Sequence, residues 1–257
     1  MNFTKSRQCN RAKAKKPAAT EPFPKRLNHS TTTVKENAGV LVFDLDGTIS
    51  DPVTGICRCL NYSLTAFGYP EVTERDVAPY IGPPLDVSLI EITGGTRDER
   101  IGEMVARYRE RYGRIGYAEN TLYPGVDEAL RELAARGIPL GVCTSKRADF
   151  AEKILEMFGL RDCFRFVSGG DVGVLKADQL AGLLHDGMID RTAVMIGDRA
   201  VDILAAKANG LASAGVLWGY GSRSELLEAG PEMILETPGQ LVDLVNIHKK
   251  SVPAGLK

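Results

Sequence analysis

The stretch VLVFDLDGTISDP, from Val40 to Pro52, joins an apolar run directly to three acidic residues, a glycine and a threonine. The run from Val40 to Phe43 is short and rich in valine, as expected of a buried strand. Asp44 and Asp46 follow it two residues apart, on the same side of the strand end. Two carboxylates this close repel each other unless a cation lies between them. The stretch therefore predicts a buried strand that ends in a charged site with a cation.

Downstream of this strand, apolar runs alternate with amphipathic helical patterns. Several of the helical patterns stop at glycines, such as Gly137, Gly159 and Gly187, and glycine commonly follows the last turn of a helix. The pattern Ser222-x-x-Glu225 predicts a reciprocal capping box at the start of another helix. Strands alternating with helices predict an α/β fold, with a Rossmann-like parallel sheet covered by helices on both faces. The further expected strands are Pro139–Thr144, Arg165–Ser168, Ala193–Ile196, Ala214–Leu217 and Met233–Leu235.

One segment interrupts this alternation directly after the first strand. Between Asp51 and Asn120 no strand-like run occurs, and about 70 residues are too many for an ordinary loop. We expect residues 52–120 to form a small α-helical cap domain, inserted into a core of residues 38–51 and 121–248. Because ligands bind at the carboxyl ends of parallel strands, a cap inserted here would overhang the site. Its expected helices are Gly55–Phe67, Leu85–Glu91 and Arg97–Arg114.

The two ends of the chain are expected to lie outside the folded part. Residues Met1–Lys35 contain nine basic side chains, one acidic side chain and no apolar periodicity. Such a segment cannot bury enough apolar surface to become ordered. We expect a disordered basic tail over residues 1–37, with a targeting signal or a basic docking arm as the alternative. Residues 249–257 are expected to form a C-terminal tail.

The composition is that of an ordinary soluble globular protein. The 257 residues carry a net charge of −1, which gives no electrostatic case for binding nucleic acid or a membrane surface. No apolar run approaches the ~18 residues that a membrane span needs. The five cysteines are irregularly spaced, and Cys57-x-Cys59 lacks the second pair of a zinc site. We expect reduced thiols in a cytoplasmic protein that is a monomer or a weak dimer.

Polar side chains also follow the next expected strands. Thr144 and Ser145 come at the end of one strand, and Asp198 follows another, with Asp202 one helical turn further on. Lys176 precedes the helix between these two strands. Because the carboxyl ends of parallel strands meet at one edge of a sheet, we expect these hydroxyl, ammonium and carboxylate groups to lie around one site.

The chain contains four motifs whose order along the sequence resembles that of the haloacid dehalogenase superfamily of aspartyl phosphatases. The resemblance extends from Ala38 to Val245, and three further segments are similar to its phosphoglycolate phosphatase-like branch. One departure is Ala177, which follows Lys176 where many relatives have glycine or proline. The motifs are D-x-D-G-T (Asp44–Thr48), T-S (Thr144–Ser145), Lys176 and G-D-x-x-x-D (Gly197–Asp202), and the segments are YIGPPL (Tyr80–Leu85), LYPGVDEAL (Leu122–Leu130) and GVLWGYGS (Gly215–Ser222).

This resemblance implies a phosphoric monoester hydrolase that forms an aspartyl-phosphate. Asp44 would be the nucleophile, and Asp46 would protonate the leaving alcohol and then deprotonate water. The implied cofactor is Mg²⁺, a hard cation suited to carboxylate and phosphate oxygens. Asp44, Asp198 and the main-chain carbonyl of Asp46 would hold the metal, which would relieve the repulsion between the carboxylates.

The resemblance also implies how the phosphate is bound. Thr144, Ser145 and the amides that follow, together with Lys176, would hold the non-bridging oxygens. Asp202 would contact metal-bound waters or Lys176 and not the metal itself. The expected partner is a small phosphorylated metabolite.

Other polar and small residues have plainer interpretations. Lys146 is expected to be a solvated charge at the start of a helix, and Gly219 and Gly221 are expected to be turn glycines. The arginines of the cap are interpreted as a solvated helix face, one of which could meet a carboxylate or a second phosphate of the substrate. Tyr80–Leu85 is either a rigid hinge or a wall of the site.

Several reactions are compatible with these motifs. A phosphoglycolate phosphatase-like activity is the first hypothesis, and a 5'-nucleotidase or another phosphatase of the superfamily is the alternative. A non-catalytic phosphate-binding module is the alternative from a different class. Asp46 argues against a dehalogenase, which needs no such acid. The absence of lysine between Asp51 and Asn120 argues against a phosphonate hydrolase of the Schiff-base type.

Overall fold

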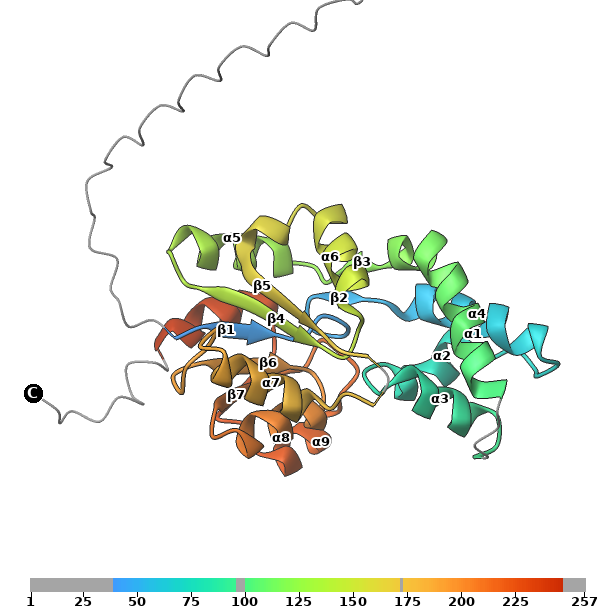
Figure 1. Ribbon diagram of the computed structural model, residues 1–257. Helices are drawn as coiled ribbons and strands as arrows, with labels where there is room; N and C mark the ends of the chain where they lie inside the picture. Colours follow the sequence, from blue (N-terminus) through green and yellow to red (C-terminus); the bar gives the residue numbers. More distant parts are fainter. Residues whose placement is uncertain (1–38, 96–99, 172, 247–257) are drawn as a thin grey trace, which may run out of the picture. The chain divides into compact units, whose positions relative to one another are not determined.

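The computed structural model describes residues 39–95, 100–171 and 173–246 (Figure 1). The tails expected over residues 1–37 and 249–257 lie outside the described residues. Within them, a six-stranded sheet has the order β5-β4-β1-β6-β7-β8, and all its pairs are parallel. The strands are β1 (Leu41–Phe43), β4 (Leu140–Thr144), β5 (Phe164–Gly169), β6 (Val194–Gly197), β7 (Ala212–Val216) and β8 (Met233–Leu235).

The first strand lies in the middle of this sheet because it is apolar on both faces. Leu41 pairs with Leu140 of β4 on one side and with Val194 of β6 on the other. A strand buried on both faces reads as a continuous apolar run, which is the pattern from which it was predicted. The Rossmann-like α/β fold expected from the sequence is therefore confirmed.

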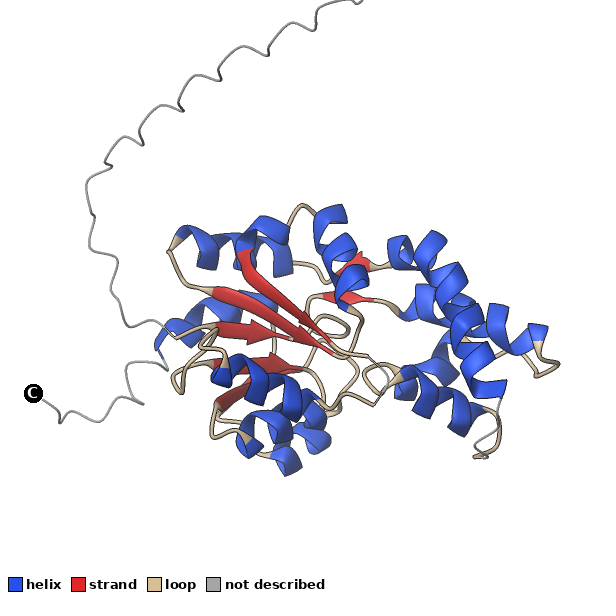
Figure 2. Cartoon of the chain, viewed as in Figure 1, coloured by secondary structure: helices blue, strands red, loops and turns tan. Residues whose placement is uncertain are grey.

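Helices cover both faces of the sheet, as Figure 2 shows. Leu41 and Phe43 pack in one apolar cluster with residues of α5 (Val126–Ala135) and α6 (Ala148–Met157). Val42 points the other way, into a cluster with α7 (Lys176–His185) and α8 (Ala200–Ala208). Burying one such side chain contributes about 1.5–3 kcal/mol, so the alternation along β1 joins both layers to the sheet.

The segment of residues 52–120 is mainly helical and has its own apolar cluster. That cluster contains Leu60, Leu64, Leu89 and Met104, which come from three of its helices. The helices of the segment, with residues 96–99 outside the described range, are α1 (Val53–Ala66), α2 (Glu74–Val77), α3 (Leu85–Ile92) and α4 (Arg100–Arg114), with 3₁₀ turns at Ala78–Tyr80 and Gly116–Glu119.

Two very short strands close the base of this segment, and the sequence did not predict them. Strand β2 (Ser50–Asp51) pairs antiparallel with β3 (Thr121–Leu122), so that Ser50 faces Leu122. Two residues are too few for the alternation of apolar and polar side chains by which strands are recognised. The pair brings the two connections of the helical segment side by side.

The predicted capping box at Ser222 is half right. Ser222 Oγ accepts a hydrogen bond from the N–H of Glu225 at 3.1 Å, at the start of α9 (Arg223–Ala229). The carboxylate of Glu225 is directed mainly to the start of α8. It accepts hydrogen bonds from Arg199 Nε at 2.9 Å and from the N–H of Ala200 at 2.8 Å. Glu225 therefore joins the starts of α8 and α9, because a nearby cation and a free helix amide compete for it.

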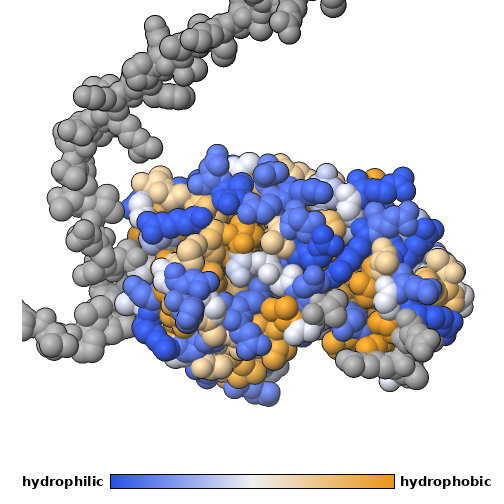
Figure 3. Space-filling view, in the orientation of Figure 1, coloured by the Kyte–Doolittle hydropathy of each residue, from blue (hydrophilic) through white to orange (hydrophobic). Residues whose placement is uncertain are grey.

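The surface mixes hydrophilic and apolar side chains on the face shown in Figure 3. Apolar residues reach the surface on α8 and α9, where Val201, Leu204 and Leu227 are exposed. None of the helices in the described part of the chain is both long and apolar enough to cross a bilayer.

Substitution by alanine should have opposite effects on stability at two glycines, one packed in β4 and the other in α7. A Cβ added at Gly141 would lie 2.2 Å from Cζ of Phe166, which is buried against it. Gly141→Ala should therefore lower the free energy of unfolding by about 1–3 kcal/mol. A Cβ at Gly182, in α7, meets nothing within 4 Å, so Gly182→Ala should raise this free energy by about 0.5–1 kcal/mol. Urea unfolding of both variants measures the difference, and equal shifts in one direction would contradict this packing.

Candidate active site

Three neighbouring strands deliver the predicted site residues to one edge of the sheet. Asp44 follows β1, Thr144 ends β4, and Asp198 follows β6. The N–H of Asp44 donates to the carbonyl of Ile196 at 2.9 Å, which continues the sheet bonding up to the nucleophile candidate. All three polar residues are buried. Their convergence follows from the strand order, since β1 lies between β4 and β6.

The carboxylates of Asp44, Asp198 and Asp202 form a buried cluster. One oxygen of each lies within 4.8 Å of the others. The pKa of Asp198 is raised mainly by burial and, to a smaller extent, by repulsion from the carboxylates of Asp202 and Asp44. Burial also raises the pKa of Asp202, although the ammonium of Lys176 opposes this rise. Since such a set of oxygen ligands suits a hard divalent cation, the residues present fit Mg²⁺.

Hydrogen bonds from the surrounding backbone and hydroxyl groups orient two of these carboxylates. Asp44 Oδ1 accepts from the N–H of Leu45 at 2.8 Å. Asp198 Oδ1 accepts from the hydroxyl of Thr48 at 3.1 Å, and its Oδ2 accepts from the N–H of Tyr220 at 2.9 Å. Each carboxylate therefore presents a defined face toward the cluster.

Lys176 supplies positive charge within this cluster. Its Nζ lies 3.0 Å from Asp44 Oδ2 and also donates to Asp202 Oδ1. Burial lowers the pKa of Lys176, but the carboxylates of Asp202 and Asp44 outweigh burial and raise it, so the ammonium stays charged. The predicted contact between Asp202 and Lys176 is present. Lys176 begins α7 despite the unusual Ala177 after it, so the departure from the family pattern does not remove the lysine from the site.

Lys146 was interpreted as a solvated charge, and this interpretation is wrong. Only 8% of its side chain is exposed, and its Nζ lies 2.8 Å from Asp46 Oδ2. The same Nζ donates to the hydroxyl oxygen of Tyr112 at 2.7 Å. The sequence around Lys146 gives no sign of this burial, because Tyr112 lies in α4, 34 residues earlier.

Asp46 lies at the junction of this ion pair and the pocket. Burial raises the pKa of Asp46, although the ammonium of Lys146 opposes this. Among the described residues, Asp46 Oδ1 has no hydrogen-bond partner. Oδ2 is therefore anchored by Lys146, whereas Oδ1 is buried without a hydrogen bond from any described residue.

The hydroxyl candidates lie beside the two catalytic candidates. Thr144 and Ser145 line the same pocket as Asp44 and Asp46. Thr144 Oγ1 accepts a hydrogen bond from the N–H of Lys146 at 3.3 Å, and its carbonyl accepts from the N–H of Gly170 at 2.8 Å. The turn after β4 therefore holds its hydroxyls at the pocket floor.

Gly219 and Gly221 were expected to be turn glycines, but their positions serve close packing. A Cβ at Gly219 would lie 2.4 Å from Cβ of Asp198, and one at Gly221 would lie 1.8 Å from the carbonyl oxygen of Asp198. Neither glycine has a positive φ angle. The absence of a side chain is what this loop needs, because its backbone passes directly over Asp198.

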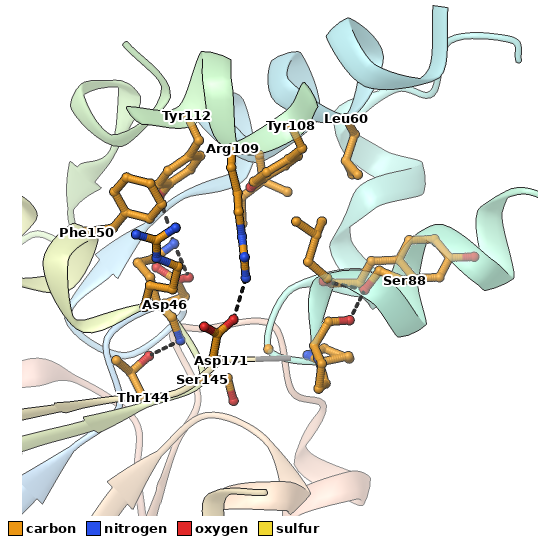
Figure 4. A pocket seen from close by; sticks show the side chains of 18 of the residues that line it. Asp46, Leu60, Ser88, Tyr108, Arg109, Tyr112, Thr144, Ser145, Phe150 and Asp171 are labelled. Carbon is orange, nitrogen blue, oxygen red and sulfur yellow. Dashed lines mark hydrogen bonds and ion pairs between the residues drawn. The ribbon is translucent and has the colours of Figure 1, made fainter. Parts of the chain in front are cut away.

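A pocket lies between the strand ends and the helical segment (Figure 4). Its floor includes Asp44 and Asp46, and Tyr108 and Tyr112 of α4 line its opposite side. Five residues of the segment Tyr80–Leu85 also line the pocket: Tyr80, Gly82, Pro83, Pro84 and Leu85. This favours the interpretation of that segment as a wall of the site over a hinge alone.

Among the described arginines of the helical segment, Arg109 lines this pocket. Its Nη2 lies 2.5 Å from Asp171 Oδ1, in the loop after β5, and Figure 4 shows this ion pair across the pocket. Other arginines of the segment pair with glutamates outside the pocket, as Arg58 and Arg111 do with Glu119. Arg58 and Arg114 are exposed, as expected of a solvated face, whereas Arg109 and Arg111 are mostly buried.

Comparison with known proteins gives consistent matches. Residues 41–216 match the family model of the haloacid dehalogenase-like hydrolases. A 5'-nucleotidase of Pseudomonas aeruginosa is 36% identical over 190 residues, which cover 72% of this chain and 86% of the relative. A phosphoglycolate phosphatase of Vibrio vulnificus is 32% identical over 217 residues, 80% of this chain and 95% of the relative. The crystal structure of a predicted phosphatase from Clostridium acetobutylicum is similar with a TM-score of 0.73 at 33% identity, covering 83% of this chain and 97% of that one.

The buried carboxylate cluster predicts how metal-free protein responds to a neutral replacement. Asp198→Asn should raise the melting temperature in EDTA, because it removes a buried negative charge. The amide can still accept from Tyr220 and can donate to the hydroxyl of Thr48, so neither contact need be lost. Wild-type protein should gain about 2.7 kcal/mol from Mg²⁺ at a hundredfold excess over Kd, and the variant should gain little.

Thermal denaturation with EDTA and with Mg²⁺ measures both effects. Asp162→Asn, at an exposed position, is the matched control and should change neither curve. A variant that is less stable in EDTA and still responds fully to Mg²⁺ would show that Asp198 is not a metal ligand.

Proposed function

The chain belongs to the haloacid dehalogenase-like hydrolases and is a phosphatase, and from this premise we propose that it hydrolyses a small phosphomonoester with Mg²⁺ through an aspartyl-phosphate on Asp44. The observation that carries the proposal is the placement of Asp44. Its carboxylate lies at the pocket floor, 3.0 Å from Lys176 Nζ and within the buried carboxylate cluster. A candidate nucleophile, a fixed cation and candidate metal ligands therefore lie close together, which supports the proposal.

In the first step, a carboxylate oxygen of Asp44 attacks phosphorus, and the bond from phosphorus to the leaving oxygen breaks. Asp46 gives its proton to the leaving oxygen, so the alcohol departs neutral. Lys176 and the hydroxyl and amides at Thr144 and Ser145 would hold the phosphoryl oxygens, where negative charge concentrates. This step converts a difficult hydrolysis into an easier transfer to the protein.

In the second step, Asp46 removes a proton from water, and the water oxygen attacks phosphorus. The bond between phosphorus and Asp44 then breaks, which releases inorganic phosphate and restores both carboxyl groups. Asp46 thus ends the cycle protonated, as it began. The raised pKa of Asp46, which follows from its burial, supports a group that carries the proton between the two steps.

The proposed cofactor would offset the negative charge of the phosphate and of the carboxylates. Mg²⁺ bound by Asp44, Asp198 and the main-chain carbonyl of Asp46 would neutralise the phosphate and let it approach the carboxylates. Asp202 belongs to the same cluster, but its Oδ1 is engaged by Lys176. We therefore assign Asp202 to holding Lys176 in place.

The leading substrate hypothesis is a phosphoglycolate-like small ester, and one observation favours the second candidate. The helical segment lines the pocket with aromatic and apolar side chains, among them Leu60, Tyr80 and Tyr108. Such a surface suits a flat apolar group, as in the base of a 5'-nucleotide. Arg109 would instead meet the carboxylate of a small acid.

The proposed function predicts a turnover that depends on both the metal and Asp44. With Mg²⁺, the protein should release phosphate from at least one member of a panel of phosphoglycolate, nucleoside 5'-monophosphates and p-nitrophenyl phosphate. EDTA should abolish this turnover, and added Mg²⁺ should restore it. Asp44→Asn should fall to the background rate while its melting temperature in Mg²⁺ shows that it is folded. Turnover by this variant within tenfold of wild type would exclude Asp44 as the nucleophile.

The role of Asp46 predicts a dependence on the leaving group. Asp46→Asn should lose about 10²–10⁴-fold in rate on alkyl phosphates, whose leaving oxygen needs a proton. On p-nitrophenyl phosphate the first step should suffer much less, because nitrophenolate leaves without protonation. The second step still lacks its base, so rapid mixing should show a burst of nitrophenolate close to one equivalent. Equal slowing of both ester classes without a burst would mean that Asp46 serves only the metal or the loop.

A further inference from the structure

Lys146 lies in a chain of buried polar contacts that starts at Asp46. Its Nζ lies 2.8 Å from Asp46 Oδ2 and donates to the oxygen of Tyr112 at 2.7 Å. That oxygen also accepts from Asn120 Nδ2 at 3.3 Å, and Asn120 Oδ1 accepts from the hydroxyl of Ser50 at 3.2 Å. All five side chains belong to residues that are buried or nearly so. The chain of contacts is therefore shielded from water along its length.

The members of this chain come from separate parts of the fold. Asp46 and Lys146 lie in the loops after β1 and β4, and Tyr112 lies in α4 of the helical segment. Ser50 belongs to β2, and Asn120 directly precedes β3. The contacts thus connect the catalytic loop to the helical segment and to both of its connections.

Tyr112 is held by its ring as well as by its hydroxyl group. The ring stacks on that of Tyr108 at 5.5 Å and 11°, and it meets the edge of Phe150 at 5.0 Å and 66°. Lys146 Nζ also lies 4.5 Å from the centre of the Tyr112 ring. A tyrosine held on all these sides fixes the position of the ammonium that contacts it.

We propose that Lys146 is a positioning residue for the acid and base Asp46, and that Tyr112 makes this positioning depend on the placement of the helical segment. The proposal rests on the function proposed above. Lys146 holds Asp46 by Oδ2, and Oδ1 is buried without a hydrogen-bond partner among the described residues. With Oδ2 held in this way, Oδ1 would be the oxygen that gives the proton to the leaving oxygen. Proton transfer needs this orientation, since the donor oxygen must lie within hydrogen-bonding reach of the leaving group.

A different role for Lys146 makes a different prediction. If Lys146 bound the phosphate directly, its loss would slow every ester to a similar extent, because all of them carry the same phosphate. If it orients Asp46, its loss matters only where Asp46 must give a proton. The ratio of the rates on two leaving groups therefore separates positioning from phosphate binding and from a general loss of structure.

The test uses glycerol 2-phosphate as the alkyl ester and p-nitrophenyl phosphate as the aryl ester, each with Mg²⁺. Lys146→Met removes the charge and keeps most of the side-chain volume. Its kcat on the alkyl ester should fall at least ~10²-fold, the lower range for a general acid, while the first step on the aryl ester stays within tenfold. The double variant with Asp46→Asn should be no slower than Asp46→Asn alone. Equal losses on both esters, or additive losses in the double variant, would overturn the proposal.

Tyr112→Phe gives a milder variant that keeps the ring and its packing. It should lower the alkyl-to-aryl rate ratio in the same direction as Lys146→Met, by a smaller factor. Tyr62→Phe and Lys207→Met are the matched controls, because Tyr62 contacts Glu110 on an exposed surface and Lys207 is exposed on α8. Both controls should keep the wild-type ratio, and a Tyr112→Phe ratio equal to theirs would remove Tyr112 from the proposal.

Failure of this inference can be told apart from failure of the proposed function. If wild-type protein hydrolyses both esters and Asp46→Asn shows the leaving-group effect, the function stands whatever Lys146→Met does. In that case a Lys146→Met variant with an unchanged rate ratio overturns the positioning role alone.

Discussion

The structure depends on the balance between the buried carboxylates of Asp44, Asp198 and Asp202 and the ammonium of Lys176. Buried charges are tolerated only when they are paired or bind a metal. This requirement is met by elements distant in the sequence that end at one point. The loop with Gly219 passes close to Asp198, where the N–H of Tyr220 donates to its Oδ2. The sheet supplies the convergence, since β1 lies between β4 and β6. The site is therefore a consequence of strand order combined with charge balance.

Much of this arrangement could be predicted from the sequence, because it follows from local patterns. The run before Asp44 is apolar on both faces, and polar residues after parallel strands must meet at the same edge. Lys146 could not be placed in this way, since its burial depends on Tyr112, which reaches it from another layer. The pairing of Ser50 with Leu122 also escaped prediction, because two residues carry no periodicity. What the sequence hides are contacts made between distant segments with no repeating pattern.

The helical segment and the sheet divide the work at the pocket. The sheet edge provides the groups proposed to act on the phosphate, including Asp44 and Thr144. The helical segment provides the aromatic side and Arg109, which would meet the organic part of a substrate. The Tyr112–Lys146 contact joins the two parts, so the part proposed to recognise the substrate also touches the part proposed to move protons.

The short ladder between β2 and β3 has a consequence for the history of such proteins. It holds the two ends of the inserted segment side by side, at Ser50–Asp51 and Thr121–Leu122. The segment is therefore attached to the sheet at two fixed points, whatever helices lie between them. The entropy of closing a loop grows only slowly with its length. Insertions or exchanges of helices beyond the ladder would thus leave the catalytic strands intact. A lineage could acquire new substrates by remodelling this segment, provided that a residue in the position of Tyr112 still met the lysine below it.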